Sequence, residues 1–118
     1  MTIGYILINQ PKKEKISFYH LPVNTKNEIV GNPVSASIVS WYMLNNQGDQ
    51  IQFVSDTYND WPFSSGVRSD QEKYPDQTNV LIDKLINLGI LKDKGIDWQD
   101  EDDPENVYIR EIINIWLN

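Results

Sequence analysis

Apolar residues in the first half of the chain follow the spacing of β-strands. Residues 3–9 and 15–21 are rich in β-branched and aromatic side chains, and the polar segment between them contains Pro11. Two such runs separated by a turn signal predict an N-terminal β-hairpin. In the polar segment that follows, a short extended piece at 28–30 is expected to form a small edge strand.

Residues 36–44 fit two structures, and the segment after them decides between the two. Asn32 as N-cap and Pro33 at the first helical position would suit a helix. Serines, β-branched and aromatic residues in this segment favour a strand instead. Residues 50–56 alternate polar and apolar positions after a loop that contains Gly48. We therefore predict a second hairpin, with strands at 36–44 and 50–56.

Two helix patterns follow in the second half of the chain. At 76–89, Asp76 is a candidate cap and apolar residues recur at helical spacing before a glycine. At 104–117, Asp103 can cap, Pro104 can take the first helical position, and a wide apolar face follows. Strands followed by helices predict an α+β domain, in which about four antiparallel strands carry two helices on one face. The other face would stay open to water as a candidate binding surface.

Composition and charge exclude several classes of function. A chain of 118 residues with no Cys and one His fits one domain without disulfides, thiolate zinc sites or cysteine nucleophiles. Its net charge of −7 disfavours contact with nucleic-acid phosphates and anionic lipids. No apolar run approaches the roughly 18 residues that a membrane span requires. We therefore expect a cytoplasmic protein that binds neither nucleic acid nor membrane and uses no metal or cofactor.

Residues that could carry catalysis are isolated from one another in the sequence. His20 ends a predicted strand, and the sequence indicates no nucleophile or orienting carboxylate to act with it. We therefore interpret it as a half-exposed strand residue. The segment 64–66 lacks the flanking glycine of a nucleophile elbow and is interpreted as a turn. The helix ending at 85–91 resembles that of winged-helix DNA-binding domains, but its acidic surroundings argue against DNA recognition. The sequence thus predicts no catalytic residue.

The connection 57–75 is the most informative segment. Connections of this length without regular structure are uncommon in compact domains and are often functional. Trp, Tyr and Arg, which occur in this one, are enriched at binding hot spots. The competing interpretation is that its aromatic side chains fold back and close the end of the core. The candidate partner-binding residues are Tyr58, Asp60, Trp61, Phe63, Arg68 and Tyr74.

Acidic residues are concentrated in the second half of the chain. Up to Asn45 there are four Lys and two Glu, whereas the remainder contains six basic and fifteen acidic residues. The acidic run lacks the alternating ligands of a calcium-binding loop, and its simplest interpretation is a solvated segment before a helix. It would also steer a basic partner and raise the association rate. The candidate steering residues are Asp100, Glu101, Asp102 and Asp103.

Together these features favour a non-enzymatic protein that binds another protein, as an inhibitor, an immunity-type factor or an accessory subunit. The partner would carry a basic surface, and an uncovered edge strand would also allow a homodimer. One alternative is a small-ligand-binding domain or a poorly marked carboxylate enzyme. A pocket enclosed by Trp41, Tyr58 and Trp61, with two carboxylates facing inward, would indicate that class. A further alternative is an acidic mimic of nucleic acid.

Overall fold

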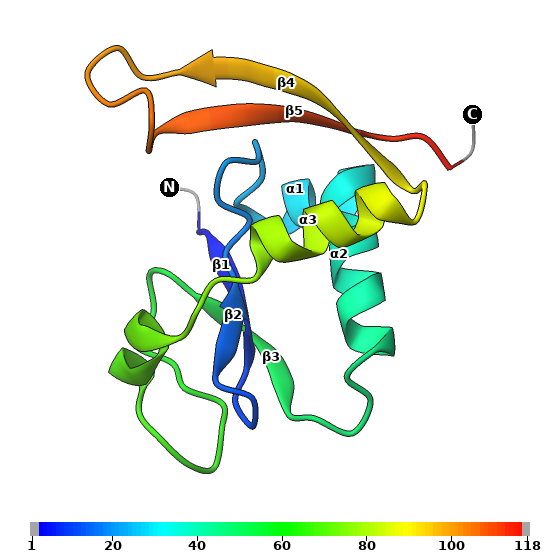
Figure 1. Cartoon of the computed structure of the whole chain (residues 1–118). Coiled ribbons are helices and arrows are strands. Elements are labelled where there is room, and N and C mark those ends of the chain that lie inside the picture. The colour runs from blue at the N-terminus through cyan, green and yellow to red at the C-terminus, as the bar shows by residue number, and fades with distance from the viewer. Residues whose placement is uncertain (1–2, 117–118) are drawn as a thin grey trace.

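Helices separate two antiparallel sheets in the computed structural model, which describes residues 3–116 (Figure 1). The first sheet has the strand order β2-β1-β3, and the second is the pair β4-β5. The fold class is therefore α+β with antiparallel sheets, as predicted. The elements in chain order are β1 (Tyr5–Asn9), β2 (Glu14–Ile16), α1 (Lys26–Gly31), α2 (Pro33–Leu44), β3 (Ile51–Ser55), η1 (a 3-10 helix, Arg68–Lys73), α3 (Thr78–Asn87), β4 (Leu91–Gln99) and β5 (Tyr108–Asn114).

The first sheet is built around β1, which pairs with a strand on each side. The predicted hairpin of 3–9 and 15–21 is confirmed, although its second strand already ends at Ile16. On the other side, β1 pairs with β3 in a register that matches Ile8 to Gln52. The central strand is thus joined to a segment more than forty residues away in the sequence.

The predicted strand at 36–44 is wrong, because this segment is part of α2. Asn32 Oδ1 accepts hydrogen bonds from the N–H groups of Val34 and Ser35, at 2.8 and 3.3 Å, and Pro33 is the first helical residue. The hydroxyl of Ser35 donates to a backbone carbonyl at 2.8 Å, so it does not oppose the helix. The predicted strand at 50–56 is present as β3, but its partner is β1.

Side-chain hydrogen bonds to the first backbone N–H groups explain where the other two α-helices begin. The predicted edge strand at 28–30 is wrong, because Thr25 and Glu28 form a capping box that starts α1. The predicted helix at 76–89 is confirmed as α3. Asp76 Oδ1 accepts a hydrogen bond of 3.0 Å from the N–H of Thr78, the first residue of α3. Within residues 3–116, none of the helices is long and apolar enough to cross a membrane.

The predicted helix at 104–117 is also wrong, because most of this segment belongs to the hairpin of β4 and β5. Residue 117 lies outside the described residues. Asp103 is a turn residue rather than a cap, and its carbonyl accepts backbone hydrogen bonds of 3.3 and 2.9 Å that close the loop between the strands. Ile109 pairs across the hairpin while Ile112 packs on the main core. The apolar residues of this segment therefore lie on both faces of a strand and not on one face of a helix.

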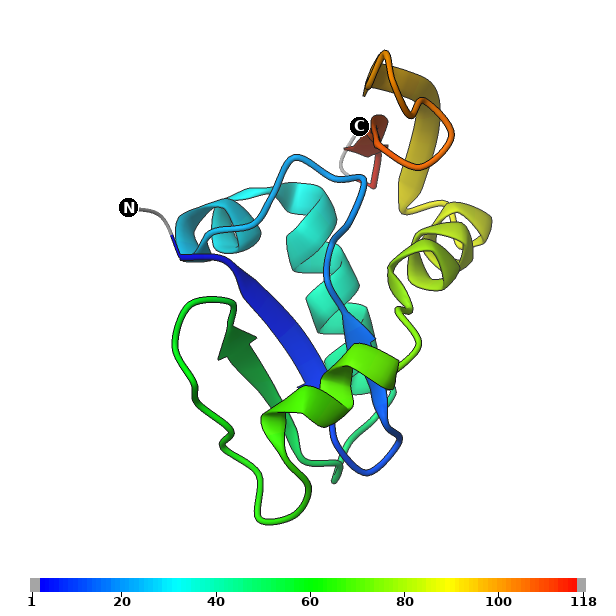
Figure 2. The same ribbon diagram turned by 90° about the vertical axis from the view of Figure 1, so that its left-hand side faces the viewer.

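Both faces of the first sheet are covered. The main core lies between the sheet and the helices, and its fully buried members include Phe18, Ile16, Ile38, Ile82, Leu85 and Leu91. On the opposite face, a second cluster joins Ile8 and Val54 of the sheet to Phe63 and Tyr74. Figure 2 shows η1 in front of the sheet and α2 behind it. The prediction of one face open to water is thus wrong, because the connection 57–75 folds over it.

Candidate functional site

Three of the candidate partner-binding residues in the connection 57–75 form the second core cluster. Phe63 and Tyr74 are each only 8% exposed and pack on the outer face of the sheet. Trp61 packs against them, and its ring meets that of Phe63 edge to face at 4.8 Å between centroids. Burial raises the pKa of the Tyr74 hydroxyl. These side chains close the end of the core, which is the competing interpretation of the sequence.

The other three candidates lie around the end of β3. Arg68 Nη2 donates to the carbonyl of Ser55 at 2.6 Å, and Arg68 Nη1 lies 3.4 Å from Asp60 Oδ1. Asp60 also accepts a hydrogen bond of 2.9 Å from the Ser55 hydroxyl. Tyr58 is 59% exposed and is the one aromatic residue of the six that faces water. Phe63 and Tyr74 of this set are therefore buried, whereas Tyr58 and Asp60 are exposed and Trp61 and Arg68 are half-buried.

A more exposed surface is found on the arm, by which we mean residues 91–114 with β4, β5 and the loop between them. Figure 1 shows the arm lying across the helices, with its loop end projecting beyond them. Ile96 and Trp98 are 56% and 52% exposed, and Val107 is exposed beside the loop. These three residues were missed by the sequence analysis. For Ile96 and Trp98 the signal was the alternation of apolar and polar residues over 96–99, at the end of β4.

The four predicted steering residues form the loop at the tip of the arm. The loop is closed by a hydrogen bond of 2.8 Å from the N–H of Asp100 to the carbonyl of Val107. Asp100 Oδ1 also accepts from the N–H groups of Asp102 and Asp103, at 2.8 and 3.1 Å. Six acidic residues and no basic ones occur between positions 97 and 105. The structure therefore places this charge beside exposed apolar side chains, and not in front of a helix.

Arg110 fixes the position of the arm over the body of the protein. Its guanidinium donates to Asn79 Oδ1 of α3 at 2.9 Å and to Asp93 Oδ2 of β4 at 2.8 Å. The hydrogen bond from Arg110, followed by one from the N–H of Gly95, holds the pKa of the Asp93 carboxyl below its usual range. The backbone N–H of Arg110 donates to the carbonyl of His20 at 2.8 Å. One residue thus connects α3, β4 and the segment after β2.

The single histidine is part of the same attachment. His20 Nδ1 lies 2.8 Å from the carbonyl oxygen of Tyr108, and the two rings stack with centroids 3.7 Å apart. His20 lies in a turn with a positive φ of 66°, not in the strand that the sequence predicts. Its neighbour Tyr19 accepts a hydrogen bond of 2.7 Å from Asn79. These contacts give His20 a structural role in holding the arm.

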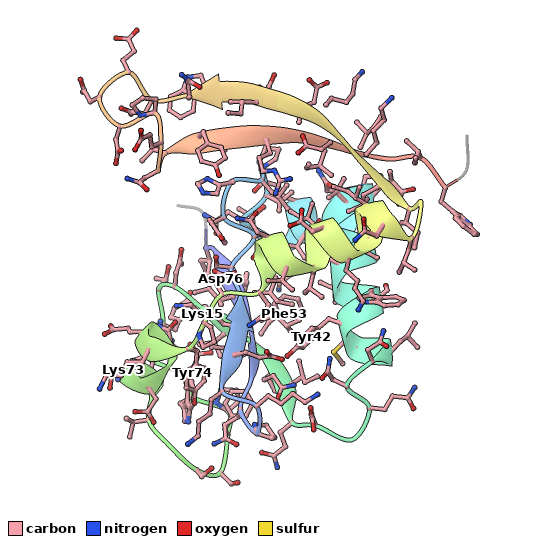
Figure 3. The ribbon with its side chains drawn as sticks, in the orientation of Figure 1. Lys15, Tyr42, Phe53, Lys73, Tyr74 and Asp76 are labelled. Carbon is pink, nitrogen blue, oxygen red and sulfur yellow. The ribbon has the colours of Figure 1, made fainter. Side chains whose placement is uncertain are left out.

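A shallow groove of about 270 Å³ lies between α2 and α3. At its base, the Tyr42 hydroxyl donates to Glu14 Oε1 at 2.6 Å, and burial followed by this hydrogen bond raises the pKa of Tyr42. Trp41 lines this groove, whereas Trp61 packs on the other side of the sheet. Figure 3 shows the same separation for Tyr42 and Tyr74. The aromatic pocket that would have indicated a small-ligand site is therefore not assembled from the predicted residues.

Neither metal chemistry nor similarity to known proteins assigns a function. Within residues 3–116, no group of three or more His, Asp or Glu side chains is arranged to hold a metal ion. No protein-family model, curated protein or solved structure matches the chain. The arm combines the exposed side chains of Ile96, Trp98 and Val107 with the acidic loop at its tip.

Proposed function

We propose that this chain is a non-enzymatic protein that binds a basic partner protein through the arm, as an inhibitor or accessory subunit. The observation that carries the proposal is the exposure of Ile96 and Trp98 on β4, next to the acidic loop. Exposed Trp side chains in such a setting are typical anchors of protein interfaces. Burial of the roughly 100 Å² that Trp98 exposes would contribute about 2.5 kcal/mol.

Charge and rigidity support the same proposal. The carboxylates at the tip of the arm would attract a basic surface and raise the association rate, and this effect weakens as salt screens the charges. Because Arg110 and His20 already fix the arm, little conformational entropy is lost when a partner binds. The apolar side chains would then provide affinity, and the acidic loop would provide speed and specificity.

The test is affinity capture from cells of the source organism, at low and moderate salt, with three matched variants. In the first, Ile96→Ser and Trp98→Ser remove the apolar contacts. In the second, Glu101→Gln, Asp102→Asn and Asp103→Asn remove charge but keep the shape of the loop. The third is a control, Val80→Ser, which changes an exposed apolar residue of α3 outside the arm.

We expect the wild type and the control to retain one stoichiometric protein with a basic surface. The apolar variant should lose it, and the charge variant should bind it more slowly and with less dependence on salt. Equal capture of the same protein by the wild type and the apolar variant would contradict binding through the arm. A captured protein that is acidic would contradict the electrostatic part.

A further inference from the structure

The two edges of the first sheet differ in how their backbone groups are satisfied. At the β2 edge, the N–H of Lys15 donates to the carbonyl of Pro75 at 3.0 Å, and the N–H of Gln77 donates to the carbonyl of Lys15 at 2.7 Å. Residues 75–77 therefore cover this edge. The β3 edge has no such strand beside it among the described residues.

Hydrogen bonds at the two ends of β3 show which of its backbone groups point away from β1. The carbonyl of Gln50 and the N–H of Asp56 both bond to the chain around β1, at 3.2 and 2.9 Å. Bonded positions alternate in an antiparallel pair, so Ile51, Phe53 and Ser55 direct their N–H and C=O groups outward. The carbonyl of Ser55 already accepts a hydrogen bond from Arg68. The outward N–H and C=O groups of Ile51 and Phe53, like the N–H of Ser55, have no hydrogen-bond partner within residues 3–116.

A small apolar pocket opens beside this free edge, between β3 and α1. Its volume is about 110 Å³, and it is lined by Tyr5, Lys26, Ile29, Val30 and Phe53. A cavity of about 150 Å³ accommodates benzene, so this pocket has the size of one aliphatic side chain. Phe53 is matched with Leu7 of the main core, which places the Phe53 side chain on the same face of the sheet as α1.

Lys26 is the one charged residue among those that line the pocket. Lys26 lies at the start of α1 with its ammonium 5.9 Å from the centroid of the Tyr5 ring. The lining contains no carboxylate, and Val30 is 75% exposed at the mouth. An aliphatic side chain in the pocket would therefore be complemented by a negative charge near Lys26.

We propose that the β3 edge binds an extended peptide segment of a partner protein as a fourth strand of the first sheet. Backbone hydrogen bonds to Ile51 and Phe53 hold the peptide, one aliphatic side chain fills the pocket, and an acidic residue lies beside Lys26. Addition of a strand to a sheet edge gives affinity through the main chain and specificity through such pockets. This surface lies on the first sheet and is separate from the arm.

The test uses a phage-displayed library of short random peptides, selected on the immobilised full chain. We expect enriched peptides to share an aliphatic residue with an Asp or Glu near it. A synthetic peptide of that sequence should shift the amide signals of Ile51 and Phe53 in NMR spectra. Methylation of alternate peptide nitrogens, which removes donors but keeps the side chains, should weaken binding at least tenfold.

Variants of the pocket distinguish binding at the β3 edge from nonspecific binding of the peptide. Val30→Glu should weaken binding about tenfold or more, whereas Leu44→Glu, a control at an exposed apolar position of α2, should leave it unchanged. Selection on Lys26→Glu should enrich basic instead of acidic residues. The Ile96→Ser and Trp98→Ser variant should bind the peptide normally, which separates this proposal from the function of the arm.

Three results would overturn the proposal. These are the absence of a shared peptide sequence, equal binding of the selected peptide by Val30→Glu and the wild type, and amide shifts confined to the arm or to the groove between α2 and α3. Circular dichroism of each variant confirms that a loss of binding is not a loss of folding.

Discussion

Phe63→Ala tests whether the connection 57–75 is a layer of the core. Phe63 is 8% exposed and packs with Ile8, Val54 and Tyr74 on the outer face of the first sheet. Truncation of a buried Phe to Ala costs about 3–5 kcal/mol, because transfer energy is lost and a cavity is left. This cluster has four buried members and lies near the surface, where the site can partly collapse. We therefore expect a loss of about 3 kcal/mol in the free energy of unfolding.

The assay is equilibrium unfolding in urea, followed by fluorescence and by circular dichroism. A domain of this size has a free energy of unfolding of about 5–15 kcal/mol, so the expected loss is easily measured. Tyr58→Ala is the matched control from the same connection, and as an exposed residue it should change stability by no more than about 0.5 kcal/mol. A cost below about 1 kcal/mol for Phe63→Ala, with an unchanged urea dependence, would refute the account of this layer.

The remaining predictions concern the arm and the start of α3. Trp98→Ala should weaken binding of the captured partner by about 2 kcal/mol in a titration while leaving the unfolding midpoint in place. Asp93 has a lowered pKa in the folded state, so it stabilises the fold at neutral pH and loses that effect as pH falls through the lowered value. Arg110→Ala should therefore reduce the loss in the free energy of unfolding that occurs as the pH falls into the acid range. An unchanged loss in that range would contradict this role. Asp76→Ala removes the carboxylate that accepts hydrogen bonds from Thr78 at the start of α3 and from Ser17, and it should cost about 1–2 kcal/mol in urea unfolding.

Local signals in the sequence were sufficient for some elements. The hairpin of β1 and β2 is defined by two apolar runs and a turn, and α3 by an apolar stripe with Asp76 before it. Each of these elements depends on neighbouring residues only, so a reading along the chain finds them. The same applies to α1, whose capping box at Thr25 and Glu28 was present in the sequence but was not used.

The errors at α2 and β5 arose where tertiary packing overrides local preference. Strand-forming residues fill α2, yet Ile38 and Tyr42 lie one helical turn apart and both are buried in the main core. Pro104, in the loop before β5, and the apolar residues after it imitate the start of a helix. Burial of Ile112 against the core and pairing of Ile109 with Trp98 instead favour a strand.

The candidate surfaces were predictable only in part. The acidic residues from Asp100 to Asp103 were recognised as a charged element, but their place at the tip of a hairpin depends on the strand character of β5. The connection 57–75 was correctly singled out as aromatic, although exposure cannot be read from composition. The free edge of β3 follows from the strand order β2-β1-β3, which is set by pairing across more than forty residues.

Site-specific photocrosslinking tests the central claim, binding of a basic partner through the arm, most directly. Val107 is replaced by p-benzoylphenylalanine, which leaves Trp98 and the acidic loop intact, and Val80 is replaced in the same way as the control. After irradiation in cells of the source organism, cross-linked products are identified by mass spectrometry. The account predicts that position 107 captures one protein with a basic surface and that position 80 does not. The same products from both positions, or none from position 107, would contradict it.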